Sequence, residues 1–307
     1  MRVSLHGLFF VSCATAYSAP IRVECIAQPA ESGRHVWHAG RFQIDSDEPI
    51  PQADVERLAQ LAEATARAIE HHAMPWYAPP SGRLRIAIFA SDEAFSDAGG
   101  PEIAAGFYDG RHAHILLRRS SWLRETGRDG VMRWQANEKL LIHELSHLCM
   151  HRILPRLPQW LIEGTAEYLS SAHQGAGRFE FTRIDASIRE QLRARVDPAD
   201  RSLKLVKLNA IASLDDKQWM KMLVAMREED RVAAYSSALL MTHYHIHGGP
   251  ERREWLAGLL EDASQQPVKA NRFLIVETQD VEEALRRYWS TRGLDLNFCL
   301  GGQDAQP

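Results

Sequence analysis

The stretch LIHELSHL, residues 141–148, places two histidines and a glutamate inside an apolar run with helical periodicity. Residues four positions apart lie on one face of a helix, so His143 and His147 can point both imidazole rings at one metal ion. Neutral imidazole is a good ligand for zinc, and zinc lowers the pKa of a bound water toward neutrality. Glu144 lies beside the histidines, where its carboxylate can accept the proton of that water as the water attacks a carbonyl.

A second helix is predicted to follow, because residues 160–169 read WLIEGTAEYL and Pro158 suits a first helical turn. The loop 152–158 is short enough to let this helix fold back against the first. Glu163 lies in an otherwise apolar stretch, and an inward-facing carboxylate is costly unless it is paired or bound to metal. A zinc site needs a third protein ligand, and this helix offers one. The alternative is an amphipathic helix whose two glutamates are solvated.

The pattern H-E-x-x-H, followed after a short insert by W-L-x-E-G-x-A-x-Y, resembles the gluzincin zinc peptidases. In particular it is similar to the compact peptidase-MA-like domains of uncharacterised bacterial proteins. The resemblance implies that Glu163 is the third zinc ligand. It also implies that Glu167, one turn further on, hydrogen-bonds to a ligand histidine and fixes its orientation.

A further similarity lies at residues 234–240, which resemble the family's helix whose first tyrosine stabilises the oxyanion of the transition state. The resemblance thus assigns that role to Tyr235, whereas the alternative is a core tyrosine at a helix start. It also implies that an edge strand, predicted here at residues 113–118, holds an extended peptide by backbone pairing.

The sequence departs from some relatives. It has no G-x-M-E-N segment before the zinc helix, which argues against an aminopeptidase of the M1 type. The metzincin pattern fails because Met150 and Ile153 stand where a glycine and a histidine are needed. His151 is too far along a straight helix to share an ion with His143, and is expected to be exposed or to lie behind the ligands.

Other histidines could either form a second metal site or have a simpler structural role. His243 and His247 could pair on one helix face as a second metal site, but no neighbouring carboxylate in the sequence completes it. His112 and His114 are most simply residues of the surface or of a strand face.

The remaining pattern predicts an α+β fold: a small mixed sheet with helices, the zinc-binding helix pair, and a mostly helical C-terminal lobe. We expect a zincin-like N-terminal subdomain over residues 19–175 and a helical subdomain over 176–307, with the boundary near Gly175-Ala176-Gly177. Predicted strands cover residues 41–45, 84–90 (central), 105–108, 113–118 and 179–184, and predicted helices cover 53–72, 131–154, 158–171, 185–196, 215–227, 231–247, 250–263 and 280–291.

The N-terminus, MRVSLHGLFFVSCATAYSAP, has a basic start, an apolar stretch and small residues at the −3 and −1 positions of a cleavage site after Ser18. Residues 1–18 are therefore predicted to be a signal peptide, and the mature protein to be periplasmic or secreted. A buried first strand or helix is the alternative, and lipidation at Cys13 is a minor option because Phe10 stands where a lipobox usually has leucine.

Composition excludes several classes of protein. The 307 residues are 45% hydrophobic and 25% charged, as in ordinary globular proteins, and the formal net charge of −4 gives no general reason to expect nucleic acid as a partner. No apolar run after residue 20 is long enough to span a bilayer. An oxidising compartment would allow a disulfide between Cys25 and Cys299, near the two ends of the mature chain, while Cys149 is expected to be buried.

Two functional hypotheses follow from the sequence. The first is an exported zinc-dependent metallopeptidase that acts on peptides or proteins, with His143, His147 and Glu163 as metal ligands and Glu144 as general base. The second is a catalytically inactive, peptidase-like binding or assembly module with structural zinc or none. The presence of Glu144, which is not needed to hold the metal, favours the first.

Overall fold

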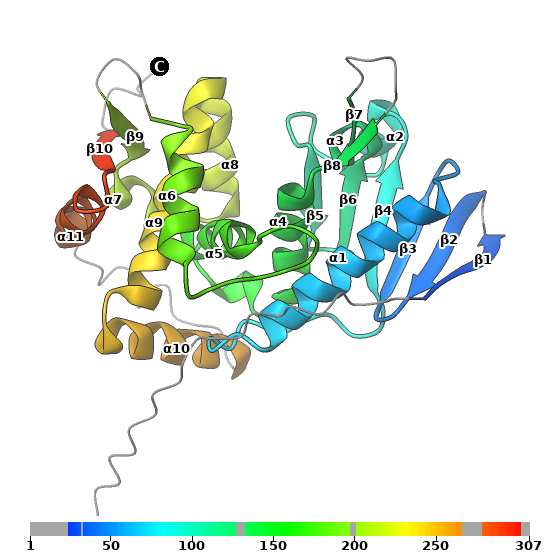
Figure 1. Ribbon diagram of the computed structural model, residues 1–307, viewed down its shortest axis with the longest axis horizontal. Coiled ribbons are helices and arrows are strands. Elements are labelled where there is room, and N and C mark those ends of the chain that lie inside the picture. Colours follow the sequence, from blue (N-terminus) through cyan, green and yellow to red (C-terminus); the bar gives the residue numbers. More distant parts are fainter. Residues whose placement is uncertain (1–23, 32, 127–132, 197–200, 266–277, 302–307) are drawn as a thin grey trace, which may run out of the picture.

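The computed structural model describes residues 24–31, 33–126, 133–196, 201–265 and 278–301, so the predicted signal peptide lies outside it. It is a mixed α/β structure with a small sheet toward one end and most helices toward the other (Figure 1). The main sheet has six strands in the order β1-β2-β3-β4-β6-β5 and contains parallel and antiparallel pairs. Its strands are β1 (Cys25–Glu31), β2 (Arg34–Ala39), β3 (Phe42–Ser46), β4 (Leu84–Phe89), β5 (Gly106–Asp109) and β6 (His114–Arg118).

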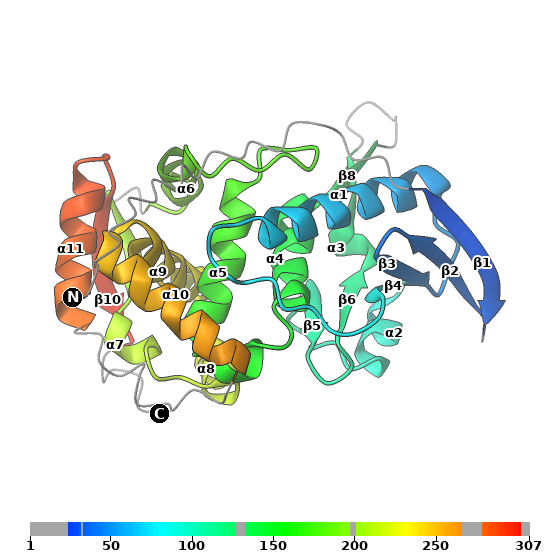
Figure 2. The ribbon, with the colours of Figure 1, turned by 90° about the horizontal axis from the view of Figure 1, so that it is seen from below.

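Strand β4 lies in the middle of this sheet, as its apolar sequence predicts. Its alternating side chains serve two layers: Ile86 and Ile88 join the main core, whereas Phe89 packs near Phe95 of helix α2 (Asp92–Asp97). Helix α1 (Gln52–Glu70) crosses the other face of the sheet from α2 (Figure 2). The strand, helix and strand predicted at residues 41–45, 53–72 and 84–90 are therefore present as β3, α1 and β4.

The strands predicted at residues 105–108 and 113–118 are present and form an antiparallel hairpin, but the prediction places the edge of the sheet at the wrong one of them. Strand β6 is paired on both sides, parallel to β4 and antiparallel to β5. The free edge at this end of the sheet therefore belongs to β5, which is only four residues long. The sequence pattern could not show this, because it does not reveal the order in which strands pair.

The helix that contains His143 and His147 is shorter than the predicted 131–154. It is α4 (Glu138–Cys149), and the Oδ1 atom of Asn137 caps its start by accepting a hydrogen bond from the Leu140 N–H at 3.3 Å. The preceding residues form strand β8, which pairs with β7 instead of extending the helix. Beyond α4 the chain makes a short 3-10 turn that contains Pro155, and α5 then begins at Gln159, as predicted. The elements around α4 are α3 (Arg119–Trp122), β7 (Leu123–Thr126), β8 (Arg133–Ala136), the 3-10 turn (Leu154–Arg156) and α5 (Gln159–Ala172).

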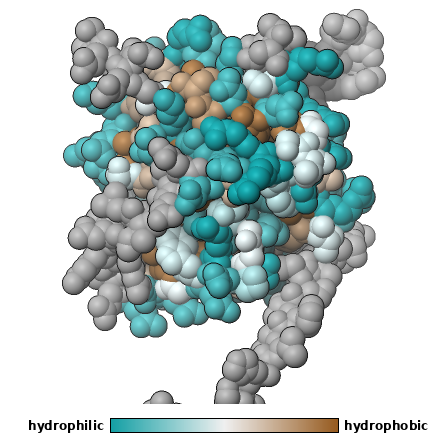
Figure 3. All heavy atoms as spheres, turned by 90° about the vertical axis from the view of Figure 1, so that its left-hand side faces the viewer, coloured by the Kyte–Doolittle hydropathy of each residue, from teal (hydrophilic) through white to brown (hydrophobic). Residues whose placement is uncertain are grey.

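The second half of the chain is mostly helical, as predicted, and two short strands accompany the helices. The strand expected at 179–184 is reduced to an isolated bridge between His173 and Phe179, because α6 already begins at Ile184. The face of this lobe seen in Figure 3 carries mainly hydrophilic side chains, with small apolar groups between them. The elements of the lobe are α6 (Ile184–Arg193), β9 (Ser202–Val206), α7 (Leu208–Ile211), α8 (Asp216–Ala225), α9 (Glu228–His247), α10 (Pro250–Gln265), α11 (Thr278–Ser290) and β10 (Asp295–Leu300).

The disulfide considered between Cys25 and Cys299 is not formed. Cys25 begins β1 at one end of the molecule, and Cys299 lies in β10 at the opposite end (Figure 1). The two ends of the described chain do not lie close together in this fold, so the pairing that the sequence left open does not occur. Cys149 is buried, as expected for a small apolar side chain. Among the described residues, no helix is long and apolar enough to cross a membrane.

A histidine in the core makes stability depend on pH. The ring of His72 stacks on Trp76 with centroids 4.3 Å apart, and its Nδ1 atom accepts a hydrogen bond from the Met74 N–H. Burial, and secondarily the positive charge of Arg253, lowers the pKa of His72 to about 4. The unfolded chain would take up this proton at its ordinary pKa of 6.5, so below that pH the unfolded state binds more protons than the folded state.

We therefore expect the free energy of unfolding to fall as the pH is lowered from 6.5 to 4, by up to about 3 kcal/mol for His72 alone. His72→Asn keeps an acceptor for the Met74 N–H but cannot be protonated, so its denaturation midpoint should fall less steeply over the same pH range. Urea denaturation at pH 7.5, 6, 5 and 4.5 measures both slopes. Equal slopes for the variant and the wild type would contradict this account.

Candidate metal centre

Three potential ligand side chains meet between helices α4 and α5. His143 and His147 lie one turn apart on α4, and their ring centroids are 4.8 Å apart. Glu163 approaches from α5, with its Oε2 atom 3.2 Å from His143 Nε2 and 3.8 Å from His147 Nε2. One donor atom from each residue lies within 4.8 Å of the other two. These three residues could therefore hold a metal ion, and the structure places them together as the sequence analysis expects.

The donor set fits zinc. Tetrahedral zinc bonds of about 2.0–2.2 Å separate neighbouring ligand atoms by about 3.3 Å, which is close to the distances of 3.2 and 3.8 Å seen here. Two imidazoles and one carboxylate also leave a fourth position for water or substrate. Glu163 and His147 are 8% and 6% exposed, so both donors are largely shielded from solvent and would otherwise need polar partners.

Surrounding side chains orient these donors. Glu167 lies on the other side of the His143 ring, with its Oε1 atom 3.3 Å from Nδ1, so Nε2 is left to face Glu163. Gln191 of α6 in turn donates a hydrogen bond of 3.1 Å to Glu167. Gln159, one turn before Glu163 on α5, donates a hydrogen bond of 2.8 Å to Oε1 of Glu163. That bond leaves the other oxygen of Glu163 directed at the histidines.

The field at this site favours positive charge. Burial by itself lowers the pKa of His143, but its hydrogen bonds to Glu163 and Glu167 outweigh burial and raise that pKa well above 6.5. The same carboxylates would attract a divalent cation. Burial lowers the pKa of His147 to about 4, so this ring is neutral near pH 7, as a metal ligand must be.

Glu144 lies next to the cluster and is only 7% exposed. Burial and the negative charge of Glu163 raise its pKa to about 7, while His143 and a hydrogen bond from the Tyr108 backbone act in the opposite direction. A carboxyl group with a pKa near neutrality can both accept and return a proton at physiological pH. Gly106 of β5 packs against its side chain, since an added Cβ there would lie 3.4 Å from Cγ of Glu144.

Tyr235 reaches the same site from α9. Its ring lies 6.1 Å from the ring of His143 and 5.8 Å from that of Trp219, centroid to centroid. Burial, followed by the negative charges of Glu163 and Glu144, raises its pKa well above 10, so the hydroxyl keeps its proton and can donate a hydrogen bond. The structure thus brings together all six residues singled out from the sequence: His143, Glu144, His147, Glu163, Glu167 and Tyr235.

The packing of α5 against α9 depends on Gly164. A Cβ atom on this residue would lie 2.2 Å from the backbone oxygen of Ala238 and 2.2 Å from Oγ1 of Thr242. The backbones of the two helices can approach this closely only because residue 164 has no side chain. This approach sets Glu163 and Tyr235, which flank the contact on the two helices, beside one another.

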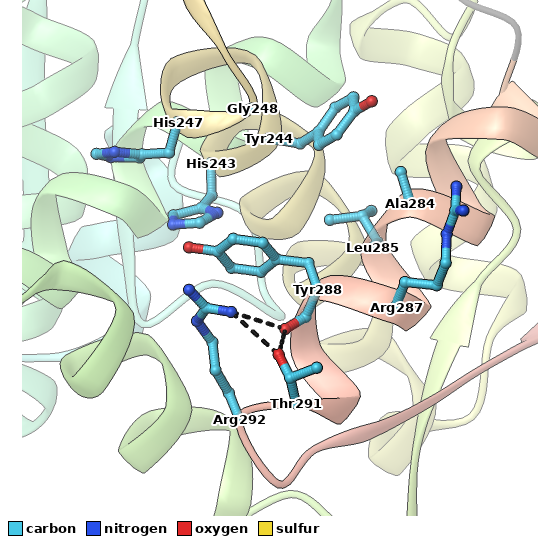
Figure 4. Close-up of a pocket in the computed structure, with 10 residues that line it drawn as sticks. All are labelled: His243, Tyr244, His247, Gly248, Ala284, Leu285, Arg287, Tyr288, Thr291 and Arg292. Carbon is cyan, nitrogen blue, oxygen red and sulfur yellow. Dashed lines mark hydrogen bonds between the residues drawn. The ribbon is translucent and has the colours of Figure 1, made fainter.

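The second histidine pair is not among the groups of three possible metal ligands found in the described part of the chain. His243 Nε2 lies 2.8 Å from Asp185 Oδ1, and His247 Nε2 lies 3.0 Å from the Tyr168 hydroxyl, so each ring has its own partner. Both histidines line a pocket of about 520 Å³, in which Tyr288 lies between His243 and Arg292 (Figure 4). This pocket shares none of the six residues of the metal centre.

Three side chains at the centre were not predicted from the sequence. Gln159 could have been found, because it stands four residues before Glu163 on the same helix. Gln191 and Tyr108 carried no signal, since tertiary packing alone brings them to the site. The Tyr108 ring lies 6.1 Å from that of His147, and its hydroxyl is hydrogen-bonded to His151 Nδ1. His151 is therefore partly exposed and hydrogen-bonded to Tyr108.

Comparison with known proteins adds no assignment to this geometry. No family model matches the chain, and a search of curated proteins finds no match.

Proposed function

We propose that this protein is a zinc-dependent metallopeptidase of the gluzincin type. One observation carries the proposal: the donor atoms of His143, His147 and Glu163 converge from two helices, with the buried carboxyl of Glu144 beside them. A site that only held a structural metal would have no need of a fourth, buried acid that does not bind the metal. The proposed export of the protein rests on the sequence of residues 1–18 alone.

Each residue has a part in the proposed reaction. His143, His147 and Glu163 would hold zinc, and a bound zinc ion would supply Lewis-acid activation of the attacking water. Glu144 accepts the proton of that water as it attacks the peptide carbonyl, and then delivers the proton to the leaving amine. Tyr235 donates a hydrogen bond to the developing oxyanion. Glu167 and Gln191 keep the His143 ring oriented.

The metal assignment is tested by removing the carboxylate ligand. Glu163→Ala should bind one zinc ion fewer per chain than the wild type, because a site of three protein ligands loses one of them and the affinity falls by more than about 100-fold. Elemental analysis after dialysis gives the stoichiometry. Glu254→Ala, at an exposed glutamate of α10, is the matched control and should keep the wild-type zinc content.

A library of unstructured peptides, incubated with the zinc-loaded protein, tests the activity. Cleavage by the wild type that disappears in Glu163→Ala supports the peptidase. Bound zinc without cleavage of any peptide favours the inactive binding or assembly module. A wild-type zinc content that Glu163→Ala does not change would contradict the metal site itself.

A further inference from the structure

A second group of possible metal ligands lies on the β5–β6 hairpin. Asp109 ends β5 and His114 begins β6, and the two residues face one another directly in the strand ladder. His112 lies in the turn between them. Its Nδ1 atom is hydrogen-bonded to Oδ2 of Asp109, and His114 Nε2 lies 3.6 Å from the same oxygen. One donor atom from each residue lies within 4.8 Å of the other two.

The ring nitrogens of His114 lack hydrogen-bond partners in this arrangement of described residues. Both of its ring nitrogens are shielded from solvent, and neither has a hydrogen-bond partner among the residues that the structure describes. Its side chain is only 15% exposed. A buried nitrogen without a partner is unfavourable, because it has lost its hydrogen bonds to water and gained none in return. A metal ion bound to one nitrogen would remove half of this cost.

The surrounding charges permit a cation. Asp109 supplies a carboxylate directly at the group. The nearest cationic side chain on the adjoining strand, Arg85, is paired with Asp45 at 3.4 Å, so its charge is partly compensated. His112 is 69% exposed, which leaves its ring free to adjust to an ion and one side of the group open to water.

We propose that Asp109, His112 and His114 form a second metal site, which binds a divalent transition-metal ion such as zinc or cobalt. Two imidazoles and one carboxylate suit these ions, whereas calcium and magnesium prefer oxygen ligands alone. The site faces solvent and shares no ligand with the proposed active centre. It does share strand β5 with Tyr108, so an ion bound there braces the hairpin that flanks His147.

Zinc stoichiometry separates the two sites. Metal-free protein, dialysed against up to three equivalents of Zn²⁺, should bind two ions per chain. His112→Ala and His114→Ala should each bind one, His143→Ala should bind one, and the double variant with His112→Ala and His143→Ala should bind none. His38→Ala, a histidine of the same sheet outside both groups, should bind two. Because His112 is exposed, His112→Ala should leave the fold intact. Its zinc content therefore tests the site even if His114→Ala disturbs the fold.

A thermal readout supports the same assignment. In the His143→Ala background, Zn²⁺ or Co²⁺ should raise the melting temperature, because an ion that binds only the folded state stabilises it. Adding His112→Ala should abolish that rise. The proposal is overturned if His112→Ala and His114→Ala bind as many ions as the wild type. One ion that is lost in His112→Ala but kept in His143→Ala would instead support this site and contradict the proposed active centre.

Discussion

Glu144→Gln should lower peptide hydrolysis by about a thousandfold or more, while the zinc content stays that of the wild type. Glutamine has nearly the same shape as glutamate, so His143 and Glu163 keep their positions and the donor set is complete. The amide cannot accept the proton of the attacking water, and loss of general acid–base catalysis typically costs about 10²–10⁴ in rate. Turnover of the best library peptide and metal content, measured on the same preparation, test both halves of this expectation.

The matched control for this variant is Glu138→Gln, the same substitution in the first turn of the same helix. Glu138 pairs with Arg57 at 3.8 Å and lies outside the group of metal donors, so this variant should turn over at the wild-type rate. Normal cleavage by Glu144→Gln would show that another group takes the proton. Loss of zinc in Glu144→Gln would show that Glu144 supports the ligands instead.

Gly164→Ala should be among the most destabilising single changes in the protein, at a cost of about 3 kcal/mol in the free energy of unfolding. The added methyl group would meet a backbone oxygen and carbon of Ala238, which cannot rotate aside, so α5 and α9 would have to move apart. If α5 moves, Glu163 is displaced relative to His143 and His147 of α4, and we expect weaker zinc binding as well. Urea denaturation and zinc titration measure the two effects.

Gly258→Ala makes the same chemical change, but we expect it to raise the free energy of unfolding instead of lowering it. Gly258 lies within α10, and a Cβ there would meet no atom within 4 Å. Alanine favours the helix over glycine by about 1 kcal/mol, so this variant should be slightly more stable than the wild type. A Gly164→Ala protein as stable as the Gly258→Ala protein would refute the close contact between α5 and α9.

Local patterns predicted the elements that carry most of the fold. A few consecutive residues of sequence are enough to recognise the apolar spacing of α1 and α9, the apolar run of β4 and the turn before β6. Strands β1, β2, β7, β8, β9 and β10 were missed. The β9–β10 pair is parallel and joins residues 202–206 to residues 295–300, so its partner lies far outside any local window. The helix predicted at residues 131–154 is longer than α4, in part because the prediction includes residues 133–136. Pairing with β7 makes those four residues a strand.

The main residues of the candidate metal centre were also predictable from local sequence patterns. Helical spacing fixes His143, Glu144 and His147 relative to one another, and the inward carboxylate of Glu163 makes sense only near a partner. Tyr235 was found through a resemblance and not through spacing. What the sequence could not supply was the support around these groups, such as Gln191 and Tyr108, because α6 and β5 come to the centre only when the chain is folded.

The parallel pairing of β9 with β10 has a consequence for how the protein is made. During synthesis on the ribosome, β9 is complete long before its only strand partner in the described chain has been translated. Until then the backbone N–H and C=O groups of β9 that pair with β10 have no strand partner. The β9–β10 pair of the helical lobe can therefore form only after β10 has been translated, and a strand left unpaired during that interval is prone to aggregation.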